Sequence, residues 1–569
     1  MNDFTAFPIP KMPLAGLVDF DLGAVTDGSY LIGLKAGAGA FRATSLRDYI
    51  RAGIGFVGAA GIQAAIDALA ATGGVVFVPP GTYTVTTTIL MRPNVALFGS
   101  AAVVIKQGNG ANLSTLIDFN SLAADRATVS GITLDGNRAN NVNSALTYMV
   151  VSGRDYTTIE NCKIQNAPGL GILTTGGNYH RIINNDFSSV FSAGLFITAS
   201  VPQSASFSTV QGNKFINVGS YAIALLWSDY VNITNNTIVG TKVNAIVNTV
   251  GTAVTLVSGT DFTTLLAGMI IRILGVEYQI DVVDSTTSLT LHSSAGTQTS
   301  VGCVAGNGDQ INVDTCSNVV VANNVILFGM SAGIMVHTFA GGAGAAGSVV
   351  ANNTIEACGN MGIGLEVGST LLDSTVVSGN FIASCGSGFS ANVVNSNDGI
   401  YIAGTANMGH VSLIGNIAKD FGAGVQEYGC YVHPDAISFI TDTGNSFQGT
   451  VADDSGLGWI AYTPTVTAST GALTTASATG YYRRHGKVVH VAINVSVTTV
   501  GSGSGALLAT LPVTASAQPF VLSGRLRNNG HMLQAFNDGT AYMSIVDYTN
   551  TFPGADGNTM FVSGSYEAA

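Results

Sequence analysis

The feature that most constrains the fold is a short motif that recurs through the middle of the chain. An aliphatic residue and any residue precede Asn or Gly, and a second Asn usually follows, as in Ile182-Ile183-Asn184-Asn185 and Val377-Ser378-Gly379-Asn380. Neighbouring copies are 23 to 36 residues apart, except for one interval of 88 residues. A period of this size is typical of a β-solenoid in which each copy is one turn. The third positions of the copies are Gly131, Asn161, Asn184, Gly212, Asn235, Asn323, Asn352, Gly379, Gly415 and Gly444.

Stacking of turns explains the residue types in the motif. A single turn cannot bury its apolar face, whereas stacked turns share a continuous core and pair each strand with the turns above and below. Asn and Gly tolerate the left-handed backbone that a tight corner needs. Stacked Asn side chains can also form hydrogen-bonded ladders along the axis. The sequence therefore predicts an all-β chain built as a parallel β-helix.

Two further segments fit this stack. The long interval is explained by an insertion at roughly residues 241–306, where apolar and polar residues alternate between turn residues, so we expect a small antiparallel β unit. Upstream, residues 61–70 have a helical spacing of apolar side chains, and a helix there would cover the open first turn. The apolar positions of that helix are Ile62, Ala65, Ile66 and Leu69.

Composition excludes several other classes of protein. The 569 residues are 47% hydrophobic and only 9% charged, which does not suit a disordered chain. The net charge of −12 argues against a nucleic-acid partner. We find neither a long apolar membrane span nor a secretion signal, and we expect no membrane insertion. The six cysteines lack metal-ligand spacing, so we expect buried free thiols and no metal or other cofactor.

The run Gly-Gly-Val-Val-Phe-Val-Pro-Pro-Gly-Thr-Tyr at residues 73–83, with the preceding helix and the Asn-cornered turns, resembles the pectate-lyase-like superfamily of phage tail proteins. The resemblance covers roughly residues 59–450. It departs from the usual pattern in one respect, because residues 53–60 are apolar where an acidic segment normally precedes the helix. It implies a right-handed parallel β-helix in a tailspike that binds a bacterial surface polysaccharide during host adsorption. Hydrolases, lyases and non-catalytic proteins all occur in this superfamily.

The resemblance also implies a division of the chain. Residues 1–57 are assigned by position to virion attachment, through a phage tail, baseplate or adaptor protein. Residues 58–240 and 307–455 form the β-helix, with the small β domain at 241–306 between them. Residues 456–569 resemble a C-terminal β-domain of tail fibres and tailspikes, which implies a homotrimer and allows glycan contacts. Trimer formation would also cover apolar outer surface of the solenoid. The expected location is the virion, after synthesis in the host cytoplasm.

Alignment of the turns on the motif gives one strand of each turn a common register. Strand residues alternate between faces, and the second and fourth positions are nearly all aliphatic, so the third and fifth point outward. Asp314, His337 and Glu366 follow one another at the fifth position, which makes them vertical neighbours. The Cα atoms of Asp314 and Glu366 are then roughly 10 Å apart.

This column suits an inverting glycosidase, in which two carboxyls about 6.5–9.5 Å apart leave room for a water molecule. We predict Glu366 as the acid and Asp314 as the base, with the reverse order left open. His337 between them would tune a pKa or bind a sugar hydroxyl. Predicted substrate contacts are the rings of Trp227, Tyr401 and Tyr431 and the amide of Asn312, with Asp309 and Asp398 as reserve carboxylates.

Other interpretations stay open at this point. The Asp-His-Glu column is equally well explained as solvent-facing surface with a weak ion pair. Trp227 is as readily an anchor packed under the insertion. A polysaccharide lyase needs cationic groups or a metal beside a uronate, and few Lys or Arg fall on the aligned strands, so it ranks second to hydrolysis. An adhesin that binds the same glycan without cleavage is the other alternative, and a site between subunits would escape these arguments.

Overall fold

The computed structural model describes residues 49–51, 58–199, 204–338, 344–368, 370–386, 397–403, 408–433, 436, 440–455, 457–485, 487–538 and 541–569. Apart from β1 (Tyr49–Arg51), the segment 1–57 predicted to attach to the virion lies outside these residues. In the described part of the chain, no helix is long and apolar enough to cross a membrane.

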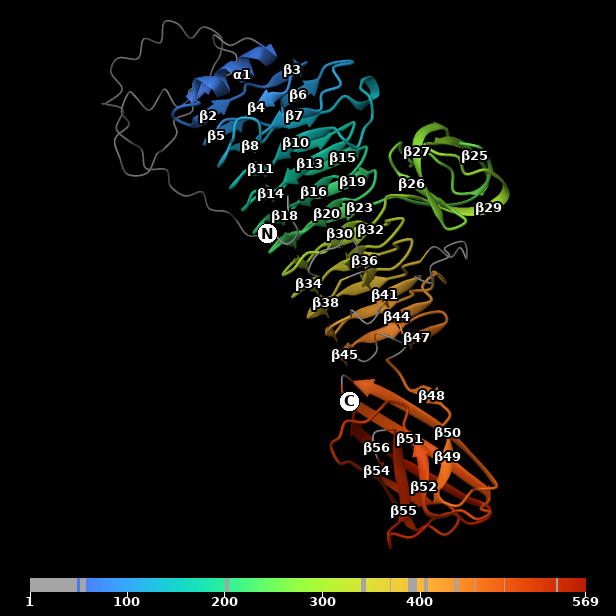
Figure 1. The fold of residues 1–569 in the computed structure, drawn as a ribbon. Helices are drawn as coiled ribbons and strands as arrows, with labels where there is room; N and C mark the ends of the chain where they lie inside the picture. Colours follow the sequence, from blue (N-terminus) through green and yellow to red (C-terminus); the bar gives the residue numbers. More distant parts are fainter. Residues whose placement is uncertain are drawn as a thin grey trace, which may run out of the picture. The chain divides into compact units, whose positions relative to one another are not determined.

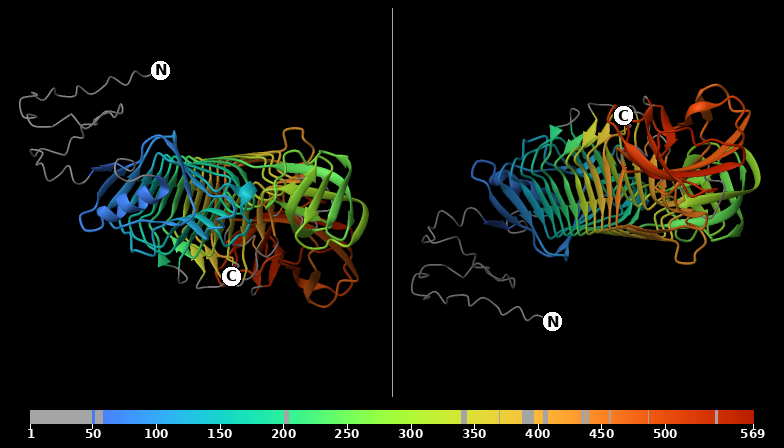
Figure 2. Two further views of the ribbon diagram at one scale, coloured as in Figure 1. Left: turned by 90° about the horizontal axis from the view of Figure 1, so that it is seen from above. Right: turned by 90° about the horizontal axis from the view of Figure 1, so that it is seen from below.

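Three parallel sheets run along one stack of turns, with each turn contributing a strand to each sheet (Figures 1 and 2). Sheet A is formed by β1, β2 (Gly74–Phe77), β5 (Val95–Phe98), β8 (Thr128–Ser130), β11 (Thr158–Glu160), β14 (Arg181–Ile183), β18 (Thr209–Gln211), β22 (Asn232–Thr234), β31 (Val320–Ala322), β35 (Val349–Ala351), β39 (Thr375–Ser378), β42 (Val411–Ile414) and β45 (Ile440–Thr443). Sheet B is formed by β3 (Gly81–Val85), β6 (Val103–Gln107), β9 (Thr133–Asp135), β12 (Lys163–Gln165), β15 (Asp186–Val190), β19 (Lys214–Val218), β23 (Thr237–Val239), β32 (Val325–Leu327), β36 (Thr354–Glu356), β40 (Phe381–Ala383), β43 (Ile417–Lys419) and β46 (Ser446–Gln448).

The third sheet, sheet C, holds the candidate site described below. It is formed by β4 (Ile89–Leu90), β7 (Thr115–Asp118), β10 (Tyr148–Ser152), β13 (Leu170–Thr175), β16 (Leu195–Thr198), β20 (Ile223–Leu226), β30 (Ile311–Asp314), β33 (Ile334–His337), β37 (Ile363–Glu366), β41 (Asp398–Ala403), β44 (Tyr428–Val432) and β47 (Ala452–Ser455). Short pairs at one corner are β17 (Ser204–Ala205) with β21 (Ser228–Asp229), and β34 (Ala345–Ala346) with β38 (Leu372–Asp373). Aliphatic and aromatic side chains from all three sheets form one continuous core inside the stack.

The corners confirm the role predicted for the Asn motif. Asn184, at the third motif position, has a left-handed φ of 54°. The second Asn of the motif is buried in a ladder of amides, and Asn353 is typical. Its Nδ2 donates to Asn380 Oδ1 at 3.0 Å and to Val321 O at 2.9 Å. Its Oδ1 accepts the backbone and side-chain N–H groups of Asn324 at 3.0 Å. The ladder joins Asn185, Asn213, Asn236, Asn324, Asn353, Asn380, Asn416 and Asn445.

Removal of one rung should destabilise the stack. Asn353→Ala is expected to lower the free energy of unfolding by about 3 kcal/mol, because buried groups of Val321 and Asn324 lose their partner. The matched control is Asn352→Gly, at an exposed corner residue with φ 54° where other turns carry Gly, and its effect should stay within about 0.5 kcal/mol. Thermal unfolding followed by circular dichroism measures both variants. An equal loss in the two would contradict the role of the ladder.

Helix α1 (Gly58–Ala68) packs against β2, β3 and β4 at the first turn. The predicted apolar positions Ile62, Ala65 and Ile66 are fully buried, and Leu69 just beyond the helix is 1% exposed. The helix thus joins the core of the stack and covers its first turn, as the sequence predicts. A 3-10 helix (Arg138–Asn140) lies between β9 and β10.

A small closed barrel interrupts the stack between β23 and β30 (Figure 1). Its strands, in barrel order, are β24 (Lys242–Val250), β25 (Ala253–Gly259), β28 (Ser288–Leu291), β27 (Val276–Ser285), β26 (Ile270–Ile273) and β29 (Thr297–Gly306). The barrel has its own core. Lys242 pairs with Gly306, so the insertion begins and ends at neighbouring points. The stack continues across it, because β20 pairs with β30 and β23 with β32.

The C-terminal part is an antiparallel sheet with a separate core. Its strands, in sheet order, are β48 (Ile460–Tyr462), β50 (Thr475–His485), β51 (Val488–Thr499), β56 (Asn558–Glu567), β53 (Val521–Leu526), β54 (Met532–Asp538), β55 (Tyr542–Asp547), β52 (Ser504–Thr510) and β49 (Val466–Thr470). All six cysteines of the chain are free and buried, as the sequence predicts.

Candidate active site

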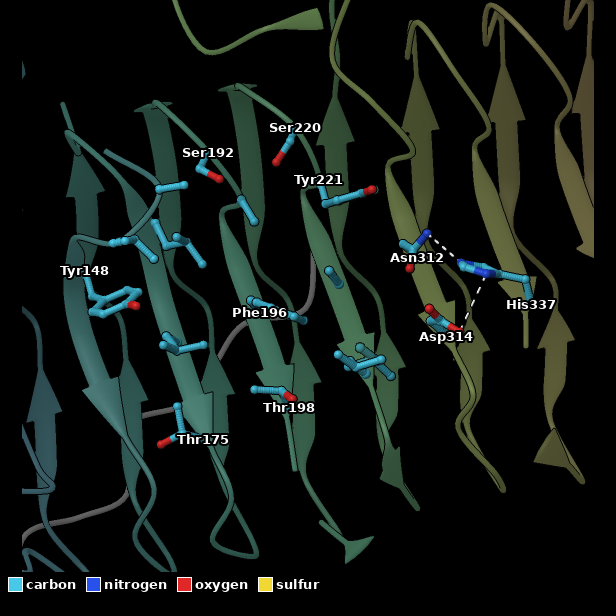
Figure 3. A pocket seen from close by; sticks show the side chains of 18 residues that line it. Tyr148, Thr175, Ser192, Phe196, Thr198, Ser220, Tyr221, Asn312, Asp314 and His337 are labelled. Atoms are coloured by element: carbon cyan, nitrogen blue, oxygen red, sulfur yellow. Dashed lines mark hydrogen bonds and ion pairs between the residues drawn. The ribbon is translucent and has the colours of Figure 1, made fainter. Parts of the chain in front are cut away.

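Sheet C carries a groove of about 510 Å³ on its outer face, over strands β10 to β33 (Figure 3). The floor of the groove is mostly apolar, and hydroxyl groups of Ser and Thr lie along its margins. A polar group of three residues, Asn312, Asp314 and His337, lies at one end. The remaining lining residues used below are Leu170, Leu173, Thr175, Ser192, Ala193, Phe196, Thr198, Ser220, Tyr221 and Ala224.

The register predicted from the sequence is confirmed. Asp314 of β30 is directly opposite His337 of β33, and His337 is opposite Glu366 of β37. The three side chains therefore occupy successive strands of sheet C, so the Cα atoms of Asp314 and Glu366 are roughly 10 Å apart. Asp314 and His337 line the groove, and Glu366 lies one strand beyond them.

His337 is held between Asn312 and Asp314. Asn312 Nδ2 donates to His337 Nε2 at 2.9 Å, and His337 Nδ1 faces Asp314 Oδ1 at 3.6 Å (Figure 3). Because Nε2 accepts in this network, the proton of the neutral ring is assigned to Nδ1. Burial lowers the pKa of His337, although the charges of Asp314 and Asp309 act in the opposite direction. Burial thus favours a neutral imidazole whose Nδ1 lies next to Asp314.

The environment of Glu366 favours the protonated form of its carboxyl group. Burial raises the pKa of Glu366, and the negative charge of Asp309 raises it further. Asp309 is itself fixed, because its Oδ1 accepts Ala332 N–H at 3.0 Å and its Oδ2 accepts Asn312 Nδ2 at 3.3 Å. Asp309 therefore belongs with this group of carboxyls, as a charge that acts on Glu366 and as a partner that orients Asn312.

The other predicted contact residues lie apart from the groove lining. Trp227 follows β20, and its backbone N–H donates to Asp314 O at 3.2 Å. Tyr401 is only 9% exposed, because its ring stacks on Tyr431 with centroids 5.6 Å apart and packs beside buried methionines. Asp398 is 1% exposed, and burial together with the charge of Glu427 raises its pKa to about 8. Tyr431 is half-buried and has the more accessible ring.

The sequence reasoning missed one column of groove residues, which includes Leu170, Ala193 and Tyr221. The first position of the aligned strand in each turn is called the strand opening. Simple alternation of strand residues predicts that the residue just before this opening points inward. The strand opening is usually Gly, and a Cβ at Gly194 would lie 2.8 Å from the core ring of Phe215. The strand opening and the position after it therefore both face the core, and the residue before the opening faces the groove. The recurrent Gly at this position is the signal that could have revealed the column.

Metal binding has no support from the geometry of the described residues, because they contain no group of three or more His, Cys, Asp or Glu that could hold an ion. The polar residues at the end of the groove can bind hydroxyl groups and present a carboxylate at Asp314, two strands from Glu366 across His337.

Comparisons with known proteins agree with this fold. The family described as right handed beta helix region matches residues 101–262. No curated protein sequence matches the chain. The crystal structure of the Dettilon tailspike protein is similar, with a TM-score of 0.51 and 14% identity over 92% of this chain and 95% of that one.

Two other similar structures have lower scores. The A-module of the mannuronan C-5 epimerase AlgE6 from Azotobacter vinelandii has a TM-score of 0.47 and 16% identity, over 69% of this chain and 90% of that one. The catalytic unit of an alpha-1,3-glucanase from Streptomyces thermodiastaticus has a TM-score of 0.40 and 13% identity, over 68% and 65%. At such identities the likeness concerns the fold. The chain is a right-handed parallel β-helix with a capping helix, an inserted β unit and a C-terminal β-domain, and it shares its β-helix fold with a phage tailspike.

Proposed function

We propose that this protein is a phage tailspike that binds a bacterial surface polysaccharide and cleaves it by glycoside hydrolysis. The observation that carries the proposal is the placement of Glu366, whose pKa burial raises, two strands away from the groove-lining Asp314 on sheet C. Two carboxyls in different environments are what acid and base catalysis of hydrolysis requires.

The proposed reaction is a single displacement. Glu366 transfers its proton to the glycosidic oxygen while the bond from that oxygen to the anomeric carbon breaks. Asp314 accepts a proton from a water molecule whose oxygen bonds to the same carbon from the opposite face. Neutral His337, held by Asn312, lies beside Asp314 with 3.6 Å between its Nδ1 and Oδ1 of the carboxylate. The carboxyls then exchange their protons with solvent, and the product has inverted configuration.

The pH dependence of the reaction should reflect the raised pKa of Glu366. The reaction needs Glu366 protonated, so the rate falls as pH rises through that raised pKa. Asp309→Asn removes the charge that helps to raise the pKa, so the alkaline limb should move to lower pH. Profiles of kcat/KM against pH measure the shift, with Asp186→Asn on the exposed face of sheet B as control. An alkaline limb that stays in place would contradict the coupling.

A lyase is less well supported by this site. Elimination next to a uronate needs a cationic group or a metal to neutralise the sugar carboxylate. Neither Lys nor Arg is among the described residues that line the groove, and the charged side chain there is Asp314. Hydrolysis therefore remains the function that the charges of the groove favour.

The proposal includes a homotrimer that attaches to the phage tail through its N-terminal segment. On the C-terminal sheet, Val521, Met532 and Phe561 are exposed, while their neighbours in sequence belong to the core on the other face. Symmetric association would cover such a surface. Light scattering of the purified chain should give three times 58.0 kDa, and a monomer at micromolar concentration would contradict the trimer.

The function is tested by incubating the protein with capsule, lipopolysaccharide and exopolysaccharide of candidate hosts and analysing the released fragments. Saturated ends support hydrolysis. Unsaturated uronates that absorb in the ultraviolet would replace hydrolysis by lyase chemistry. Binding without fragments would leave an adhesin. If no host polymer is bound and none is cleaved, the proposal is overturned.

A further inference from the structure

We infer that the groove over β10 to β30 selects an uncharged sugar residue that carries a methyl group, either as an acetyl substituent or as a 6-deoxy carbon. The inference rests on the proposed function and names the substrate class of the same site. It concerns the sugar that lies beside Asp314, on the side of β20.

The floor of the groove is the first argument. Leu170, Leu173, Ala193 and Ala224 are 4–7% exposed and present aliphatic surface, and the ring of Phe196 lies among them. Phe196 is directly opposite Leu173 on one side and Ala224 on the other, so the apolar surface is continuous across three strands. A sugar hydroxyl placed there would lose its water without gaining a partner, whereas a methyl group gains from burial.

Charge is the second argument. The groove contains Asp314 at one end, and Asp309 and Glu366 lie beyond it, while its described lining residues include neither Lys nor Arg. A uronate bound beside these carboxyls would meet like charge without a cation to neutralise it. The glycan residue in this groove is therefore uncharged.

The margins of the groove supply the polar contacts that a sugar ring needs. Ser192 and Ser220 lie before their strands, and Thr175 and Thr198 lie at the strand ends, so hydroxyls flank the apolar floor on both sides. A pyranose can thus place its methyl-bearing substituent on the floor and its hydroxyls toward the margins. The occupant is a sugar with both kinds of group, rather than a purely apolar ligand.

The test is saturation-transfer NMR of the full chain with four probes. These are N-acetylglucosamine, L-rhamnose, D-glucose and D-glucuronic acid. At least one of the first two should bind about tenfold more tightly than the last two, with the strongest transfer at its acetyl or 6-deoxy methyl protons. Which of the two binds distinguishes the source of the methyl group.

Two variants locate the binding. Phe196→Ser should weaken the methyl-bearing probe about tenfold, and Phe207→Ser, at an exposed aromatic of the same turn outside the groove, should not. Ala224→Asn, which adds a polar side chain to the floor without removing one, should also weaken binding and serves if Phe196→Ser fails to fold. Three results would overturn the inference. They are binding of glucuronic acid as tight as that of the methyl-bearing probes, no binding of either methyl-bearing probe, and equal effects of the two Phe variants.

The outcomes separate this inference from the proposed hydrolysis. Methyl-dependent binding without fragments from any polysaccharide would keep the groove assignment and remove hydrolysis. Cleavage of a uronate polymer that lacks methyl groups would keep the enzyme and overturn the groove assignment.

Discussion

Glu366→Gln is expected to lower kcat for polysaccharide cleavage by at least about 10³-fold while glycan affinity stays within about threefold. The amide has the shape of the protonated carboxyl and can still donate a hydrogen bond, but it cannot transfer a proton to the leaving oxygen. Fragment release measures kcat, and retention of labelled polysaccharide measures affinity.

The controls for this variant come from the same turn of the stack. Glu356→Gln, at an exposed position of β36 in sheet B, should leave both measurements unchanged. Asp314→Asn should remove cleavage like Glu366→Gln, because the base is then lost. Undiminished cleavage by Glu366→Gln would mean that other residues catalyse the reaction. The next candidates are Asp309 and Asp398, or a groove between subunits. NMR of fresh products should show inverted configuration if the two carboxyls act as proposed.

Asp398→Asn is expected to stabilise the protein at pH 8 and to flatten the dependence of its stability on pH. Asp398 is 1% exposed at the start of β41, and burial together with the charge of Glu427 raises its pKa to about 8. An unfolded Asp loses its proton near pH 3.9. At pH values between these two pKa values, the folded chain therefore holds a proton on Asp398 that the unfolded chain has lost.

The sign of the effect follows from this difference. The stabilisation is complete below about pH 4 and is lost as pH rises through about 8. A difference of about four pKa units corresponds to an upper figure of roughly 5 kcal/mol, and relaxation of the site should reduce it to a few kcal/mol. Asp398→Asn has no ionisable proton at this position, so its stability should not decline in this way as pH rises. Tm measured from pH 5 to pH 9 checks it, with Asp186→Asn as an exposed control. Parallel declines in Asp398→Asn and native protein would contradict the assignment.

The sequence determined the stack and its register, because both depend on local geometry. Asn or Gly at corners such as Asn184 marks the left-handed turn, and the distance between copies sets the length of each turn. Strand residues alternate with a fixed period of two, so alignment on the corners was enough to place Asp314, His337 and Glu366 on successive strands. The inserted antiparallel β unit was predicted for the same reason, since it breaks the period, whereas its closure into a barrel was not.

The tertiary structure decided what the groove is and which carboxyls are buried. A small residue at the strand opening, usually Gly and Ala222 in the turn of Tyr221, faces the core and reverses the alternation. The reversal turns Tyr221 and its column outward, and a local period of two cannot express it. The covering of Tyr401 depends on residues of other turns, since Gly364 leaves space that Met335 and Met361 fill. The raised pKa values of Glu366 and Asp398 likewise come from burial and from charges on other turns. The local sequence pattern determines the path of the backbone. The burial and the electrostatic environment of each site residue depend on side chains that lie far apart along the chain and meet only in the folded stack.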